Sequence, residues 1–526
     1  MRINRRGLLG LSAAACFTPW SLPALAQQGK ELRYAPWSAL RVLDPVTTNA
    51  YVTRNHGYMV YDTLFSIDAQ YRPQPQMVQD WTVSDDRLTY TFTLRPGLRF
   101  HDGAPVTAQD CTASIIRWSK RDAVGARLAA ATDRLTALDP RTFQLVLKSP
   151  FGPLLEALAK PSSYPLFVMP KRFADTPPEK AVTEVVGSGP LKFLASEFKP
   201  GASWAYERNA DYVPRAEPPS GLTGGKVVKI ERLSMIWFPN KETAINALRK
   251  GEIDVIEAIK ADQREALQGG PRIVVRRRFA PSTSTIRFNW AQPPFDNVDV
   301  RRAVQAVATQ RDFMDATIGD PASYQICGAL FGCGTPLESE AGVVDPGTPD
   351  IAKAKALLQK GGYNGEKVVL ITPGDNAAYA GLAPLTQQIL RSIGMNCEIQ
   401  AIEWTSFLSR RSNSGPVAQG GWNIANAVLE MSDLLSPLGN LNFDARGTAG
   451  YTGFVDDPET EKLKTQFQSE TDPVKQKAIA VAMQKRAYDL VFYIPLGTYF
   501  DYEAFQANVK DFILAPLPVM WQVDKQ

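Results

Sequence analysis

Apolar and polar positions alternate most clearly over residues 78–150. Tyr90, Phe92 and Leu94 alternate with threonines, and residues 142–147 repeat the alternation with other polar neighbours. A period of two places every apolar side chain of a segment on the same face. Each segment therefore predicts a strand with one buried face.

A helix is predicted between these two strands. Thr107 and Asp110 have the spacing of a capping box, which satisfies backbone N–H groups at a helix start. Ile115, Ile116 and Trp118 supply the apolar side. Strands flanking a helix predict a small α+β unit inserted early in the chain.

Strands alternate with helices in two later regions. In residues 229–259, Asn240 suits a helix N-cap and Gly251 a helix end before the next strand. Residues 367–411 repeat the alternation. Such alternation predicts parallel or mixed α/β sheets, and two separate units favour two lobes with a ligand crevice between them.

Residues 1–26 are typical of an export signal and are excluded from the predicted fold. A basic start precedes an apolar stretch, and small residues lead to a predicted cleavage after Ala26. Arg5 and Arg6 before a leucine pair favour a twin-arginine signal, with an ordinary secretory signal as the alternative. Cys16 as a lipid-attachment site is disfavoured, because alanine stands three positions earlier, where leucine is usual.

Charge and length restrict the function classes. The signal contains three of the 58 basic residues and no acid, so the mature chain has one more basic than its 54 acidic residues. Nucleic-acid binding, which needs a basic excess, gains no support. About 500 residues exceed what one hydrophobic core serves, so two or three lobes are expected.

Four cysteines remain after the signal. Cys327 and Cys333 lie in a glycine-rich segment flexible enough to bring their Cβ atoms together, and export places them in an oxidising compartment. We expect a local disulfide between them. Cys111 and Cys397 lie in helical and strand patterns and are expected to be buried thiols.

No catalytic or metal-binding motif stands out. The two histidines, His56 and His101, lack metal-ligand or triad-like spacing, and His101 precedes Gly103 in a predicted tight turn. Nucleophile-elbow, zinc-helix and phosphate-loop motifs are absent from the sequence. No catalytic residue, metal or cofactor is assigned, although acids that converge only in space remain an alternative.

Several segments together resemble the bacterial extracellular solute-binding proteins of family 5, which include dipeptide-, oligopeptide-, nickel- and glutathione-binding proteins. The matching segments span nearly the whole mature chain, and in order they are residues 61–65, 77–86, 90–103, 187–190, 209–212, 247–254, 288–290, 299–303, 394–395 and 421–422. The resemblance implies a periplasmic ABC-importer component that captures a peptide or peptide-like solute.

The resemblance also implies an α/β architecture, the two-lobed type II, cluster C-like periplasmic binding protein fold with an extra inserted α+β domain. Two crossovers, near Phe279 and Tyr499, would serve as hinges. The implied division is residues 27–49, 186–272 and 499–526 for lobe I, 50–185 for the insertion and 273–498 for lobe II. Closure would bury the solute, and the closed form would dock on membrane permease subunits, the protein itself being a monomer.

The pocket is expected between the lobes. The predicted aromatic walls are Trp404 and Trp422 of the second lobe, with Trp37 facing them from the first lobe. Asn289, Asn423 and Asn426 are the predicted polar contacts. Buried tryptophans are as often core as pocket, so a core role for the first two stays open.

One feature of dipeptide-binding relatives is missing. Their Gly-Trp-x-Gly-Asp segment supplies an acid for the ammonium of the ligand, and the matching position here is Ala425. A buried ammonium needs a paired acid. A free-amino dipeptide therefore requires Glu430 or Asp433 as a substitute, and direct nickel ligation by histidine is disfavoured.

Two other function classes stay open. An exported hydrolase acting on peptides or sugars would need a nucleophile or convergent carboxylates. A peptide sensor or chaperone would share the fold without serving transport. Peptide that is retained intact would favour binding over hydrolysis.

Overall fold

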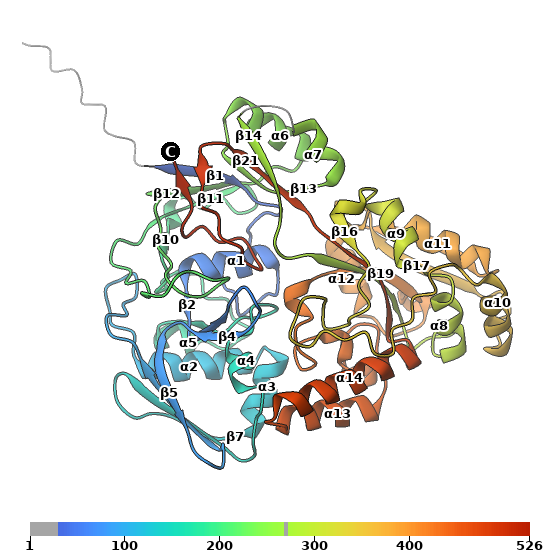
Figure 1. Cartoon of the computed structure of the whole chain (residues 1–526), viewed down its shortest axis with the longest axis horizontal. Helices are drawn as coiled ribbons and strands as arrows, with labels where there is room; N and C mark the ends of the chain where they lie inside the picture. Colours follow the sequence, from blue (N-terminus) through green and yellow to red (C-terminus); the bar gives the residue numbers. More distant parts are fainter. Residues whose placement is uncertain (1–29, 268–271) are drawn as a thin grey trace, which may run out of the picture.

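A seven-stranded sheet, here called the first sheet, lies near the N-terminus of the fold. The computed structural model describes residues 30–267 and 272–526 (Figure 1). The signal segment 1–26 lies outside the described residues. The strand order is β10 (Leu191–Phe193), β11 (Ser203–Arg208), β12 (Arg232–Ile236), β1 (Glu31–Ala35), β13 (Val255–Ile259), β21 (Tyr502–Gln506) and β14 (Ile273–Arg277).

The centre of the first sheet is parallel. Strand β1 pairs in parallel with β12 and β13, and helix α6 (Lys241–Lys250) forms the crossover between these two. Asn240 caps α6 by accepting two backbone N–H bonds, and Gly251 ends it at φ 73°. Both predicted helix boundaries are confirmed.

The second sheet has six strands and helices on both faces. Its order is β16 (Tyr324–Gln325), β20 (Tyr493–Tyr499), β15 (Ser282–Phe288), β19 (Ile424–Glu430), β17 (Lys367–Pro373) and β18 (Asn396–Ile402). Ile286 and Phe288 of β15 face an apolar core that includes side chains of α8 (Val298–Gln305), α9 (Gln310–Thr317), α10 (Ile351–Lys360) and α11 (Leu382–Ser392). Helix α12 (Trp404–Arg411) packs with a separate cluster that contains Ala425 of β19.

Residues 51–174, here called the inserted unit, separate β1 from β10. A four-stranded antiparallel sheet runs in the order β5 (Val78–Val83), β6 (Thr89–Leu94), β8 (Thr142–Leu147) and β7 (Thr132–Ala137). Helix α2 (Ala108–Ser119) begins with the predicted Thr107–Asp110 capping box. The α+β character of this region is confirmed. Its other helices are α1 (Tyr51–Val60), α3 (Ala123–Ala131), α4 (Leu154–Leu158) and α5 (Lys171–Ala174).

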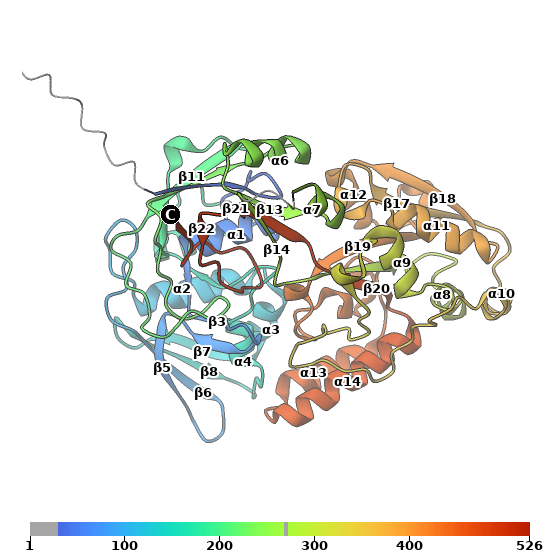
Figure 2. The ribbon, with the colours of Figure 1, turned by 45° about the horizontal axis from the view of Figure 1, so that its top comes forward.

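The chain passes between the two sheets twice. Strand β14 still pairs with β21 in the first sheet, and β15 begins the second sheet at Ser282. The first crossing therefore lies between Arg277 and Ser282, a segment that includes Phe279. The second crossing lies between Tyr499 of β20 and Tyr502 of β21. The two crossings connect the same pair of sheets (Figure 2).

The inserted unit packs against residues 458–490, which precede the last strand of the second sheet. One apolar cluster contains Phe92 of β6 and Met483 of α14 (Pro473–Leu490). Helix α13 (Pro458–Ser469) contacts the inserted unit through the Arg127–Glu461 ion pair, at 2.7 Å. Among the described residues, no helix has the length and apolarity to cross a membrane. The remaining elements are α7 (Ala261–Leu267), β2 (Asp62–Thr63), β3 (Phe65–Ile67), β4 (Pro73–Pro75), β9 (Phe167–Val168), β22 (Val509–Lys510) and β23 (Asp524–Lys525).

The loop that contains Cys327 and Cys333 follows β16 of the second sheet. Cys327 and Cys333 form a disulfide with their Cα atoms 6.0 Å apart. Cys111 and Cys397 are buried free thiols, as predicted. Burial raises the pKa of the Cys397 thiol to about 11, so the thiol is protonated at neutral pH.

Candidate functional site

Trp37 follows β1 and faces residues from the inserted unit. Its backbone N–H donates to the Glu257 carboxylate at 3.1 Å, and its ring centroid is 6.2 Å from that of Tyr51. The side chain remains 38% exposed. The indole is therefore accessible to a solute at the junction of the first sheet and α1.

The three predicted asparagines are buried and bind the protein itself. Asn289 donates to the carbonyl of Trp422 at 2.8 Å, and Asn423 donates to the carbonyl of Pro293 at 2.8 Å. Asn426 donates to a threonine hydroxyl on α11 at 3.0 Å. In this conformation the amides satisfy buried internal groups, and their contact with a solute stays a prediction.

Trp422 is a core residue in the structure. It is fully buried, and its indole N–H donates to the carbonyl of Arg411 at 3.0 Å. Trp404 begins α12, is half-buried, and has its ring centroid 5.7 Å from that of Tyr379. Trp422 therefore lies in the core in this conformation, the alternative that the sequence left open, while Trp404 retains exposed surface.

Ionic contacts join α1 of the inserted unit to the end of β19. Arg54 donates to Glu430 at 2.6 Å, and the Tyr51 hydroxyl donates to Asp433. A backbone N–H of the inserted unit also donates to Asp433 at 3.3 Å. Glu430 and Asp433, the two acids that the sequence offered as ammonium partners, therefore lie together where the inserted unit meets the end of β19.

Burial makes this contact electrostatically strong. Arg54 is 3% exposed, and burial opposes its charge. The carboxylates of Glu430 and Asp433 outweigh that effect, so the pKa of Arg54 lies above its usual value. A ligand ammonium arriving here would compete with Arg54 for the same carboxylates.

Charged groups also lie beside the two crossings. Glu257, the central residue of β13, approaches Arg278 of the first crossing, with 3.9 Å between Arg278 Nη2 and Glu257 Oε1. Burial raises the pKa of Glu257 and of Asp501, which lies on the second crossing, while Arg278 partly offsets both shifts. The charges of the two crossings thus act on one another.

The two histidines have structural roles. His56 is buried with Nδ1 2.8 Å from the hydroxyl of Tyr206, and burial lowers its pKa to about 3. His101 contacts the carbonyl of Gly189 at 3.0 Å, and burial lowers its pKa to about 4. Gly103 has φ 87°, which confirms the predicted turn. Both rings are neutral at physiological pH.

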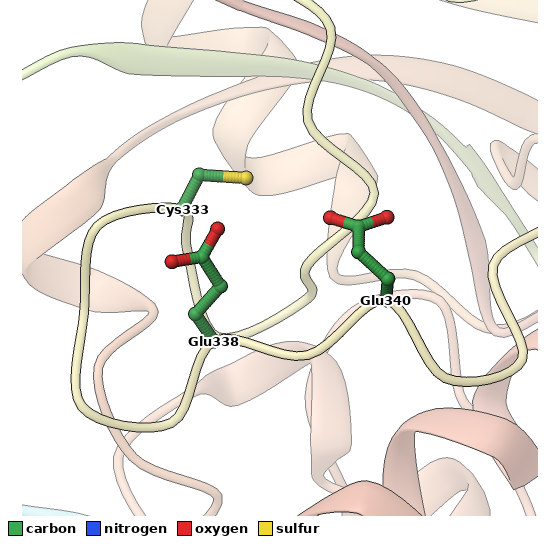
Figure 3. A group of neighbouring side chains, drawn as sticks. All are labelled: Cys333, Glu338 and Glu340. Carbon is green, nitrogen blue, oxygen red and sulfur yellow. The ribbon is translucent and has the colours of Figure 1, made fainter.

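Cys333, Glu338 and Glu340 form a small cluster with ligand atoms within 4.8 Å of one another (Figure 3). The Cys333 sulfur is bonded to Cys327 and offers no thiolate. Glu338 accepts the backbone N–H of Gly334 at 3.0 Å. The disulfide and this hydrogen bond, both within the loop, therefore account for the positions of Cys333 and Glu338.

Sequence reasoning missed Tyr51 and Arg54. The only local signal was an arginine within an otherwise mainly uncharged helix. The structure buries eight of the ten residues of α1, Arg54 among them. A buried arginine requires an anionic partner. That partner lies more than 370 positions later in the chain, and only the tertiary structure identifies it.

Comparisons with known proteins agree along the whole chain. The family model described as bacterial extracellular solute-binding proteins, family 5 Middle, matches residues 72–439. A probable peptide ABC transporter periplasmic-binding protein, y4tO of Sinorhizobium fredii, is 36% identical, with 100% of each chain covered. The glutathione-binding protein GsiB of Escherichia coli K12 is 25% identical, with 98% of this chain and 97% of GsiB covered.

Solved structures share the fold. The periplasmic binding protein DppA from Helicobacter pylori, in complex with peptide STSA, has a TM-score of 0.80 at 22% identity, covering 94% of this chain and 98% of that one. A dipeptide-binding protein from Pseudoalteromonas sp. SM9913 with Met-Leu has a TM-score of 0.77 at 21% identity, covering 94% and 100%.

Proposed function

Because the chain belongs to the bacterial extracellular solute-binding proteins of family 5, we propose that it captures a peptide or peptide-like solute for an ABC importer. The two-lobed periplasmic binding protein fold expected from sequence is confirmed by the solved structures. The peptide assignment is supported by the y4tO relative, whose name specifies peptide transport.

The observation that carries the proposal is the contact between α1 and the end of β19. Arg54 and Tyr51 on one side meet Glu430 and Asp433 on the other, and two chain crossings connect the sheets behind them. Hinge motion at the crossings separates or joins these groups. A solute that contacts the joined form better than the separated form shifts the population toward closure.

We propose the lobe division predicted from sequence, with the first crossing placed after Arg277. Residues 27–49, 186–277 and 499–526 then form lobe I, residues 50–185 its insertion, and residues 278–498 lobe II. Sheet membership supports this division, because the strands of the first sheet fall in lobe I and those of the second sheet in lobe II, apart from Tyr499 at the end of β20. The closed form docks on permease subunits, and the protein acts as a monomer without changing the solute chemically.

The family implies a periplasmic location. Export through a twin-arginine signal with cleavage after Ala26 is our proposal for reaching it. The mass of the mature protein from periplasm checks the cleavage position. Replacing Arg5 and Arg6 with lysines should leave the precursor in the cytoplasm, whereas a general secretory signal would tolerate the change.

The decisive experiment incubates purified protein with pooled di- to tetrapeptides, then identifies the retained species by mass spectrometry. Intact retained peptides would support the proposal. Cleaved products accumulating with time would replace it with the hydrolase alternative. Retention of no peptide would remove the peptide assignment.

A further inference from the structure

Arg287 of β15 projects into a small cavity on the α12 face of the second sheet. The cavity is also lined by Asn442, Tyr451 and Thr452. Arg287 donates to the carbonyl of Thr452 at 2.8 Å and to the side-chain oxygen of Asn442. It is 3% exposed, and its Nε has no hydrogen-bond partner. One donor of this buried cation is therefore unused.

Arg411 ends α12 and approaches the same tyrosine from another side. Its Nη2 lies 3.3 Å from the Tyr451 hydroxyl, and its buried Nε is also unpartnered. The guanidinium carbons of Arg287 and Arg411 lie 4.9 and 5.7 Å from the Tyr451 ring centre. Two cations thus converge on one aromatic ring.

Among the described residues, no acid balances the positive charge of this group. In the part of the chain that the structure describes, neither Arg287 nor Arg411 forms an ion pair with a carboxylate. The nearest acid on the cavity lining, Asp444, is paired with Arg446 at 2.7 Å. A buried, unpaired cation destabilises the folded protein unless an anion compensates its charge.

The pKa shifts agree with this imbalance. Burial lowers the pKa of Arg287, Tyr451 opposes that shift, and Arg411 adds a smaller lowering effect. Burial by itself would raise the pKa of Tyr451, but Arg411 and Arg287 outweigh it and hold that pKa below its usual value. Asp433, at the contact with Tyr51, is close enough to act on Tyr451 as well.

We propose that Arg287, Arg411 and Tyr451 form an anion subsite that binds a carboxylate of the captured solute. The two unused Nε–H groups and the Tyr451 hydroxyl provide donors, and guanidinium groups suit a planar carboxylate. Among the two acids at the α1 contact, Asp433 acts on Tyr451 through its charge, so the subsite lies within electrostatic reach of that contact. This inference rests on the proposed function and names the solute class as carboxylate-bearing.

The test compares two matched pools of di- to tetrapeptides, one with free C-terminal carboxylates and the other with C-terminal amides. Retained peptides are quantified by mass spectrometry, and affinities of the best binders are measured by calorimetry. We expect the free-carboxylate member of each pair to bind roughly 10- to 100-fold more tightly, the range of a charged hydrogen-bonded contact.

Variants locate the contact. Arg411→Gln, at a half-buried position, should reduce the preference for the free carboxylate to near one, and Arg287→Gln should do the same if it folds. Thermal unfolding checks folding. Lys367→Gln removes one exposed positive charge from the same sheet and should keep the full preference. A merely structural loss would weaken both pools equally and leave the preference intact.

The outcomes separate the two proposals. Equal retention of both pools by the unmodified protein would overturn the anion subsite while leaving peptide capture standing. A preference that survives Arg411→Gln and a folded Arg287→Gln would also overturn it. Retention of neither pool would overturn peptide capture, and the anion subsite would then have no peptide to bind.

Discussion

Arg54 and Glu430 form the contact in which a single side chain has the largest expected effect. Their side chains are 3% and 14% exposed, and removing one partner leaves the other charge buried. Arg54→Gln should therefore destabilise the closed form by about 3 kcal/mol. Peptide affinity, measured by calorimetry, should fall accordingly.

The double variant Arg54→Gln with Glu430→Gln tests whether the pair is the cause. Replacing both charges removes the uncompensated ion, so part of the lost affinity should return. The exposed pair Lys462–Glu459, 3.4 Å apart on α13, is the matched control, and Lys462→Gln should have little effect. Strictly additive losses would show that Arg54 and Glu430 are not coupled.

Glu257 should make stability depend on pH with a particular sign. Its pKa is raised in the folded protein, chiefly by burial and despite Arg278, from an ordinary value of 4.5. Above that value the unfolded chain binds fewer protons than the folded chain, so this group's contribution falls as pH rises. Glu257→Gln should therefore gain thermal stability relative to the unmodified protein between pH 4 and pH 7.

Thermal unfolding at several pH values measures this difference. The glutamine keeps an oxygen for the backbone N–H of Trp37, so the change mainly removes the titrating group. Glu207→Gln, at an exposed position near the end of β11, controls for the loss of one negative charge. A difference between Glu257→Gln and the unmodified protein that stays constant with pH would contradict the assignment.

Residue-level prediction succeeded where a role is local. The Thr107–Asp110 capping box and the Gly251 helix end depend on neighbours within a few positions, and both occur in the structure. The pocket residues depend on distant partners. The three asparagines bind backbone or hydroxyl groups that no local pattern identifies, and whether Trp422 faces a pocket or a core depends on the packing of α12.

At the scale of elements, a disulfide closes a short loop, residues 327–333, within the segment between β16 and α10. Cys327 and Cys333 are six residues apart, and the loop-entropy relation gives about 2 kcal/mol for so short a closure. Replacing both with serine should lower the free energy of unfolding by about that amount. Chemical denaturation with linear extrapolation measures it.

Alkylation checks the same pairing independently. Cys327 and Cys333 should resist alkylation until reduced, even after denaturation, whereas the buried Cys111 and Cys397 should react as soon as the chain unfolds. Intact mass then gives two modifications without reductant and four with it. Four modifications in the denatured, unreduced protein would contradict the disulfide.

At the scale of the whole molecule, the sequence predicted two α/β units and an inserted α+β unit, because the periodicity of each is continuous along the chain. It did not predict how the inserted unit rests on the second half. The backbone N–H of Gly152 donates to the carbonyl of Gln468 at 2.7 Å, a contact between segments more than 300 positions apart. This hydrogen bond joins the inserted unit to the end of α13.

Gly152 therefore offers a way to change the arrangement of the halves. A Cβ at this position would lie 1.6 Å from the carbonyl oxygen of Glu470, between α13 and α14. Backbone atoms cannot yield by that distance without moving the whole segment. Gly152→Ala should therefore separate the inserted unit from α13 and α14 and favour the open form.

Small-angle X-ray scattering of the peptide-saturated protein should give a larger radius of gyration for Gly152→Ala than for the unmodified protein. Peptide affinity should fall, because part of the binding energy is used to close a strained contact. Gly374→Ala is the control, since a Cβ there meets its nearest neighbour at 3.5 Å. An unchanged radius together with unchanged affinity would show that closure does not require Gly152 to approach Glu470, and that the hinge brings the halves together by another contact.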